Sequence, residues 1–110
     1  MYTNTSALRF IREPKPRRER PSVSVLHDST DVRVVLFDFP PGAAMPMVRT
    51  PSAVILRALR GEALVQTLTG EHRLTEGTSV SLAPREAYAV RSDVNRVTVL
   101  ATITPGPGAR

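Results

Sequence analysis

The chain has 110 residues, of which 41% are hydrophobic, and it carries a net charge of +5 and no cysteine. One domain with one modest core is expected, because a chain of this length buries roughly two-thirds of its unfolded surface. The absence of cysteine excludes disulfides, thiolate metal sites and a cysteine nucleophile. No apolar run approaches the roughly 18 residues of a membrane span, and the first residues lack the layout of a secretory signal. We therefore expect a cytoplasmic protein that does not associate with membranes.

Residues 1–21 are predicted to form a basic arm ahead of the compact domain. The segment from Arg9 to Arg20 holds six basic and two acidic side chains, so most of the net charge lies there. Prolines at positions 14, 16 and 21 bias the residues before them away from helix, which indicates an extended connector. The apolar cluster Leu8, Phe10 and Ile11 is suited to packing on a partner subunit. Nucleic acid is not expected as a partner, since basic runs of this kind are more often solvated connectors.

Residues 22–104 show short apolar stretches separated by turns, without a helical period. The predicted strands are 23–26, 32–39, 54–60, 63–68, 73–74, 79–82, 87–90 and 96–104. The strand at 32–39 is apolar on both faces, which predicts packing on two sides. In the last strand Val97, Val99, Ala101 and Ile103 alternate onto one face. This pattern predicts an all-β sandwich or barrel, followed by a flexible tail at residues 105–110.

The turn glycines occur at a spacing that resembles the two sequence motifs of the cupin superfamily. Gly42 and Gly61 match the glycines that begin and end the first motif, and Gly77 matches the first glycine of the second. The second glycine of that motif falls on Arg85. The resemblance covers residues 22–104 and implies a jelly-roll β-barrel, the double-stranded β-helix of small RmlC-like bacterial cupins. It also implies that the N-terminal segment packs against a partner subunit. The apolar strand at 32–39 and the apolar N-terminus need more cover than one small barrel gives, so we expect a homodimer.

The positions at which the cupin motifs hold a metal carry unsuitable side chains in this sequence. Val48 and Thr50 occupy the two histidine positions of the first motif, and Val54 occupies its glutamate position. Tyr88 occupies the histidine position of the second motif, and Ser92 its asparagine position. Metal ions in such barrels need imidazole and carboxylate donors, whereas valine offers no lone pair. We therefore expect neither a metal nor another cofactor.

These replacements predict a mostly apolar cavity wall with few polar groups. Strand alternation places on one face Val48, Thr50, Val54, Leu56 and Ala58. Such a lining is typical of a pocket for an apolar or aromatic small molecule, although small barrels are also often packed solid with side chains. Two roles are open for Tyr88. Its phenol can donate a hydrogen bond to a ligand, or it can fill the space of the missing metal with its hydroxyl bonded to Thr50 or to backbone.

Other residues with suitable chemistry are not expected to form a site. Met45 and Met47 lie out of phase with Val48, so both should face away from the cavity, and a thioether copper site is not expected. His27, Asp28 and Ser29 have the residue types of a hydrolase triad. Neighbouring strand residues point to opposite faces, so the three are not expected to converge. His72 lies beside a turn and is expected to be solvated.

Three functions remain open from the sequence. The first is a metal-free module that binds a small organic ligand, with Tyr88 and Thr50 as polar anchors and Val48, Val54 and Leu56 as the apolar wall. The second is a degenerate cupin enzyme of the dioxygenase, isomerase or decarboxylase type, for which no catalytic residue is identified. The third is a structural homodimer with a filled barrel. We expect the first, a binding module rather than an enzyme.

Overall fold

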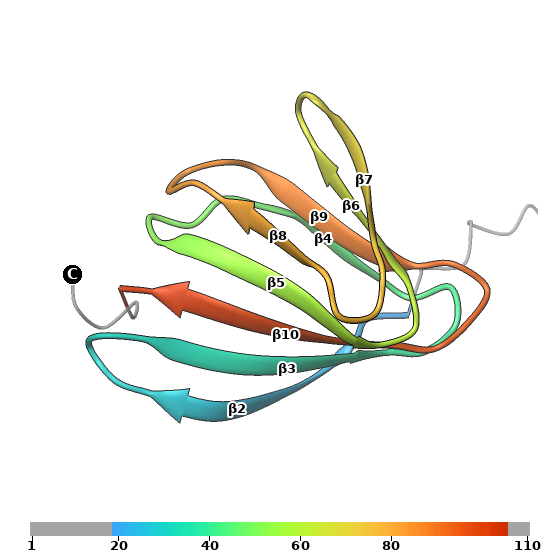
Figure 1. The fold of residues 1–110 in the computed structure, drawn as a ribbon, viewed down its shortest axis with the longest axis horizontal. Coiled ribbons are helices and arrows are strands. Elements are labelled where there is room, and N and C mark those ends of the chain that lie inside the picture. Colours follow the sequence, from blue (N-terminus) through green and yellow to red (C-terminus); the bar gives the residue numbers. More distant parts are fainter. Residues whose placement is uncertain (1–18, 106–110) are drawn as a thin grey trace, which may run out of the picture.

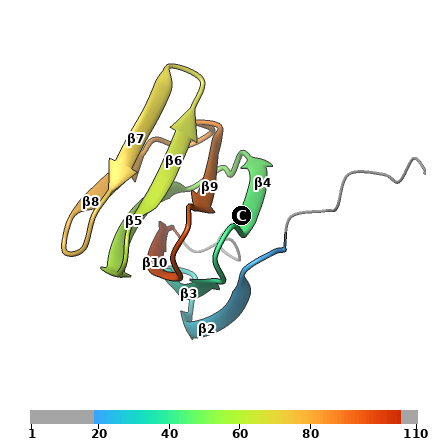
Figure 2. The same ribbon diagram turned by 90° about the vertical axis from the view of Figure 1, so that its right-hand side faces the viewer.

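The computed structural model describes residues 19–105, and the regular elements in this range are all β-strands. The predicted arm and the predicted tail therefore lie almost entirely outside the described residues. Nine strands in this range form two antiparallel sheets that face each other (Figures 1 and 2). Residues 19–105 contain no helix that is long and apolar enough to cross a membrane. The predicted all-β class is confirmed.

The two sheets have five and four strands. The first sheet contains, in spatial order, β2 (Ser22–Asp28), β3 (Arg33–Phe39), β10 (Val97–Thr104), β5 (Ala53–Arg60) and β8 (Ser79–Leu82). The second sheet contains, in spatial order, β4 (Ala44–Val48), β9 (Tyr88–Ser92), β6 (Ala63–Thr67) and β7 (Gly70–Leu74). Neighbouring strands are often far apart in the sequence: β10 pairs with both β3 and β5, and β9 pairs with both β4 and β6.

The core lies between the facing surfaces of the two sheets. Val97, Val99 and Ala101 of β10 are at most 1% exposed, as their alternation predicted, and Ile103 packs against the same core. The largest side chains closed to solvent come from both sheets and include Phe39, Leu56, Leu74 and Val65. On β3 only Val35 and Phe39 of the inner face are buried, whereas Val34 and Leu36 on its outer face are half-buried.

β4 is a strand that the sequence did not predict. Its residues follow a proline-rich turn and include Pro46, which cannot donate a ladder hydrogen bond. The position of β4 explains why this proline is tolerated, since it is the edge strand of the second sheet. The pairing of β4 with β9 also shifts register between Met45 and Val48, which marks a β-bulge or similar irregularity.

The turns at one end of the barrel depend on glycines with positive φ angles. Gly42, Gly61 and Gly77 stand there with φ angles of +76°, +78° and +80°, a region that side chains disfavour. Gly61 also needs the space, because a Cβ atom at this position would lie 2.6 Å from the carbonyl oxygen of Arg96. Ser92, which is buried, donates from Oγ to the carbonyl of Pro40 at 2.7 Å and joins the end of β9 to this turn region.

The other end of the barrel carries the loops that follow β4 and β8, residues 49–52 and 83–87, which we call the rim loops. Figure 1 shows them next to each other at the left-hand end of the molecule, where β5 and β9 begin. The backbone N–H of Arg85 donates to the carbonyl of Thr50 at 2.7 Å, so the two loops are joined directly. Tyr88 begins β9 beside them, and β10 ends at the same end of the barrel.

β2 is the outer edge of the first sheet and is exposed along its whole length. Its pairing with β3 shifts register between Val25 and His27, which leaves Leu26 at the irregularity. Val23, Val25 and Leu26 are 56%, 57% and 58% exposed. Just before this strand, the carbonyl of Glu19 accepts a hydrogen bond from the backbone N–H of Ala44 at 2.9 Å. The start of the described chain is therefore attached to β4 in the other sheet.

Candidate functional site

The structure gathers the four metal-ligand positions of the cupin motifs at the rim end of the barrel. Val48 is the direct cross-strand neighbour of Tyr88 in the pairing of β4 with β9. Val54 lies on β5 in the opposite sheet and belongs to the same buried cluster as Tyr88, against which Val48 also packs. Thr50 lies between these strands, in the first rim loop.

The five residues predicted to contact a ligand differ in how far they are buried. Val54 and Leu56 are 1% exposed and contact other core side chains, so they are closed to solvent in this structure. Val48 and Thr50 are half-buried at the rim. Tyr88 is 5% exposed, which is less than these two residues and more than Val54 and Leu56. A ligand that arrives at this end of the barrel meets Val48, Thr50 and Tyr88 before it meets the inner pair.

The hydroxyl of Tyr88 has no hydrogen-bond partner among residues 19–105. The predicted alternative of a bond to Thr50 is not formed, because Thr50 Oγ1 donates instead to the carbonyl of Ser52 at 2.9 Å. Burial of the phenol raises the pKa of Tyr88 above its ordinary value of 10.0. The side chain is therefore neutral at physiological pH, and its O–H group is able to donate to an acceptor that residues 19–105 do not supply.

Thr67 is a polar neighbour of Tyr88 that was not identified from the sequence. It is the cross-strand partner of Tyr88 on β6, on the side opposite Val48, and it is 6% exposed. Its hydroxyl is already used, since Oγ1 donates to the carbonyl of Gly70 at 3.2 Å and accepts from the backbone N–H of Thr69 at 3.3 Å. The shared phase of Ala63, Val65 and Thr67 is the signal that places this side chain inward.

The rim loops bring two arginines together. Arg49 Nη1 donates to the carbonyl of Arg85 at 2.9 Å, in addition to the backbone bond between the loops. Arg85 has a φ angle of +66°, a left-handed conformation that is uncommon for residues other than glycine. The residue at the second glycine position of that motif is therefore an arginine in a conformation that suits glycine. Among the described residues no ion pair involves either side chain, since the four that form lie elsewhere.

The residues at the motif positions do not fit a metal ion. Two valines have no donor atom, the Thr50 hydroxyl is a weak neutral donor already bonded to backbone, and a neutral phenol is a poor ligand. Elsewhere in residues 19–105 the structure assembles no group of three or more His, Cys, Asp or Glu side chains able to hold a metal. His72 is exposed on β7 and His27 is exposed on β2, in different sheets.

The prediction that both methionines face away from the barrel is wrong for Met45. Met45 pairs with the buried Val90 and packs against the core, whereas Met47 is 43% exposed. The register shift between Met45 and Val48 is the physical reason, because an extra residue in a strand breaks the alternation of faces. A groove of about 350 Å³ lies nearby on the outer face of the second sheet, lined by Ala44, Met45, Pro46, Met47, Leu64, Gln66, Ala89, Val90 and Arg91.

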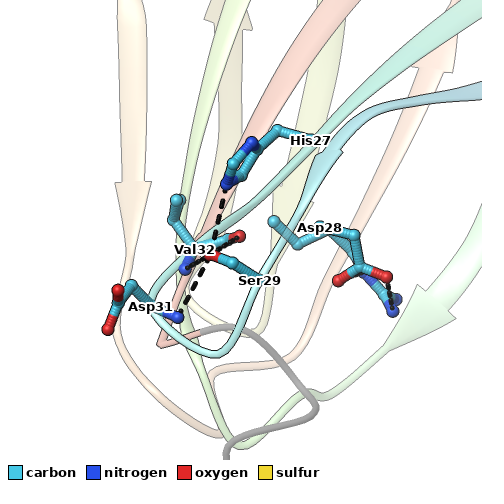
Figure 3. A network of polar contacts seen from close by, with 6 residues as sticks. His27, Asp28, Ser29, Asp31 and Val32 are labelled. Atoms are coloured by element: carbon cyan, nitrogen blue, oxygen red, sulfur yellow. Dashed lines mark hydrogen bonds and ion pairs between the residues drawn. The ribbon is translucent and has the colours of Figure 1, made fainter.

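The prediction that His27, Asp28 and Ser29 do not converge is confirmed for the three together, although His27 and Ser29 contact each other. His27 Nε2 lies 3.2 Å from Ser29 Oγ, because residues two apart share a side, whereas Asp28 points away to Arg33 (Figure 3). Ser29 Oγ also donates to the carbonyl of Val32 at 3.2 Å and accepts the backbone N–H of the same residue. The hydroxyl thus stabilises the turn between β2 and β3, and these residues do not form a triad.

Comparison with known proteins connects this architecture to the cupins. No protein-family model matches the sequence, and no curated protein matches it. The structure is similar to a cupin domain from Bordetella pertussis, with a TM-score of 0.71 and 20% identity over 82% of this chain and 98% of the other. An RmlC-like cupin from Methanocaldococcus jannaschii gives a TM-score of 0.69 and 22% identity over 87% and 90% of the two chains. The predicted fold, a cupin-type double-stranded β-helix, is therefore confirmed.

A third similar structure is an enzyme. The DMSP lyase DddQ from Ruegeria pomeroyi gives a TM-score of 0.72 and 21% identity over 77% of this chain. This chain covers 47% of the length of that lyase structure. At this level of identity the likeness establishes a shared fold.

Proposed function

We propose that this chain is a metal-independent module that binds a small organic ligand at the rim end of its barrel, through Tyr88. The observation that carries the proposal is Tyr88, a residue that is only 5% exposed and whose hydroxyl forms no hydrogen bond within residues 19–105 but is not closed off from solvent. A ligand with an acceptor atom would form a neutral hydrogen bond to this hydroxyl, which typically contributes about 0.5–1.5 kcal/mol.

The surroundings of the hydroxyl support a ligand that is otherwise apolar. Val48 flanks Tyr88 on β4, and Val54 belongs to the same cluster from the opposite sheet. Ligand pockets commonly combine an apolar lining with a small number of polar groups that fix orientation. Entry requires a local rearrangement, because Val54 and Leu56 are closed to solvent. Two hydrogen bonds join the rim loops, one from Arg49 to the carbonyl of Arg85 and one from the N–H of Arg85 to the carbonyl of Thr50, and an opening between these loops would have to break them.

The lyase of similar fold suggests catalysis as an alternative, but binding is the better proposal for this chain. The positions that hold ligands in metal-dependent cupins have no suitable donor set here, so metal-dependent chemistry has no support from these side chains. Tyr88 is a neutral phenol with a raised pKa, which makes it a weak acid and an unsuitable base near neutral pH. No reaction step is assigned to it.

The test is a thermal-shift screen of small aromatic and aliphatic compounds against the full chain. A ligand of the folded state raises the melting temperature in a concentration-dependent way. We expect Tyr88→Phe to weaken binding of a hit by roughly two- to tenfold, the effect of losing one neutral hydrogen bond. Tyr2→Phe, which changes the other tyrosine of the chain, should leave the shift unchanged. Equal loss in both variants, or none in Tyr88→Phe, would count against the proposal.

A second candidate function is a homodimeric structural domain. The observation in its favour is β2, an edge strand whose apolar side chains Val23, Val25 and Leu26 are more than half exposed. An unprotected edge strand readily pairs with another strand. A second copy of β2 across a two-fold axis would cover it, and the two functions do not exclude each other.

A further inference from the structure

The rim loops concentrate positive charge beside Tyr88. Arg49 and Arg85 lie on the two adjacent loops, where the guanidinium group of Arg49 is held by the carbonyl of Arg85 at 2.9 Å. Tyr88 lies three residues after Arg85. On β9 it pairs with Val48 of β4, the residue directly before Arg49. Arg49, Arg85, Tyr88 and the half-buried Val48 therefore belong to one small region at the rim.

The charges of these arginines are not balanced by neighbouring carboxylates within residues 19–105. The four ion pairs use Arg33, Arg73, Arg91 and Arg96. Glu86 is the acidic residue of the second rim loop, and its Oε1 accepts the backbone N–H of Ala83 at 2.9 Å instead of meeting an arginine. Asp31 stands at the same end of the barrel in the loop between β2 and β3, and it forms no ion pair with another residue of the range 19–105. The rim loops themselves have a net positive charge.

Arg85 also occupies a backbone conformation that suits glycine. Its φ angle of +66° is in the left-handed region, where a Cβ atom is strained. Glycine would relieve this strain, so the arginine brings a guanidinium group to the rim at a cost in conformational energy. Residues held in such conformations are concentrated at ligand-binding sites.

We propose that the ligand of this site is a small organic carboxylate, whose anionic group binds to Arg49 and Arg85 and whose apolar body lies against Val48 and Tyr88. A guanidinium group has five N–H donors, so Arg49 keeps donors free beyond the one given to Arg85. Arginine matches the planar geometry of a carboxylate with paired, charge-assisted hydrogen bonds. The inference rests on the proposed function at Tyr88 and adds to it the chemical class of the ligand.

The experiment compares benzoate with benzamide, which has nearly the same shape but no charge. Both compounds are titrated into the ¹⁵N-labelled full chain, and the backbone amide shifts are followed by NMR. We expect benzoate to shift amides of residues 48–52 and 83–88, with an affinity at least tenfold above that of benzamide. Raising the salt concentration should weaken benzoate binding and leave benzamide binding unchanged.

Three variants test the arginines. Arg85→Gly removes the guanidinium group and suits the left-handed backbone, so the melting temperature should be unchanged or higher while benzoate loses its advantage over benzamide. Arg49→Gln should reduce the same advantage. Arg57→Gln is the matched control, because Arg57 is an exposed arginine on β5 away from the rim loops, and this variant should behave as the wild-type chain does.

The outcomes separate this inference from the proposed function. Equal affinities for both compounds at the rim amides, with loss of binding in Tyr88→Phe, would overturn the carboxylate and leave the binding site standing. Benzoate binding that survives in both rim variants would also overturn the carboxylate. Shifts confined to other residues, or no shift with either compound up to millimolar concentration, would overturn both proposals.

Discussion

Tyr88 combines a raised pKa with a hydroxyl that forms no hydrogen bond within residues 19–105. Burial removes water from the phenol, which raises the pKa of Tyr88, because the charged phenolate is poorly solvated there. The hydroxyl itself is not closed off from solvent, and it forms no hydrogen bond with any residue from 19 to 105. A phenol that stays neutral is a dependable hydrogen-bond donor over the whole physiological pH range.

The raised pKa of Tyr88 predicts a loss of stability in alkali that is absent from Tyr88→Phe. Below the unfolded pKa of about 10, Tyr88 is protonated in both states and adds no pH dependence. Above it the unfolded chain loses the proton first, so the unfolded state binds fewer protons and the free energy of unfolding falls until the pH passes the folded pKa. Urea unfolding at several alkaline pH values should show a steeper decline in the wild-type chain than in the variant.

A direct check is the near-ultraviolet absorbance of phenolate, which tryptophan does not obscure because the chain has none. The difference between the titration curves of the wild-type chain and Tyr88→Phe belongs to Tyr88. A midpoint at or below 10 in that difference would contradict the burial argument.

The identities of the residues at the candidate site could be predicted from motif spacing, whereas their hydrogen bonds could not. Val48, Val54 and Tyr88 meet because glycine spacing sets the lengths of the strands and turns between them. The partner of a hydroxyl depends on one side-chain rotamer and on the local loop. Thr50 bonds to Ser52 in its own loop, and no sequence pattern distinguishes this from a bond to Tyr88. The clustering of Arg49 with Arg85 depends on loop packing in the same way.

At the scale of strands and turns, local irregularities decide what sequence patterns can predict. Alternation works along β10, where regular pairing puts every second residue in the core. It fails along β4, because the shift between Met45 and Val48 puts both residues inward. The strand itself was missed because Pro46 argues against a strand, and only the finding that β4 is a sheet edge removes this objection.

The turns that carry the motif glycines predict a graded response to alanine. Gly61→Ala and Gly77→Ala both force a side chain into the left-handed region, at a cost of about 1 kcal/mol. Only at Gly61 does the new Cβ also meet a backbone oxygen, that of Arg96 at 2.6 Å, whereas Gly77 faces open space. We expect Gly61→Ala to lower the free energy of unfolding by roughly 3 kcal/mol or more, as measured by urea unfolding. Equal losses in the two variants would mean that the Arg96 carbonyl moves away at little cost.

At the scale of the whole molecule, the exposed edge strand predicts the oligomeric state. If β2 pairs with β2 of a second copy, light scattering should give twice the chain mass of 12.0 kDa. Val25→Lys should yield monomers, because a charge in the middle of an edge strand opposes pairing. Val94→Lys is the control, since Val94 is 76% exposed in a turn outside β2 and its variant should remain dimeric. A monomeric wild-type chain, or a dimeric Val25→Lys, would contradict pairing through β2.

The unequal construction of the two barrel ends has a consequence for engineering. The turns at the glycine end tolerate little change, because their conformations and contacts are fixed by Gly61 and its neighbours. At the rim end, Arg49, Pro51 and residues 83–85 are exposed and contribute no side chain to the buried cluster. Randomised sequences at these rim positions would present new recognition surfaces on an unchanged core. The chain is thus a cysteine-free scaffold of small size for selecting binders.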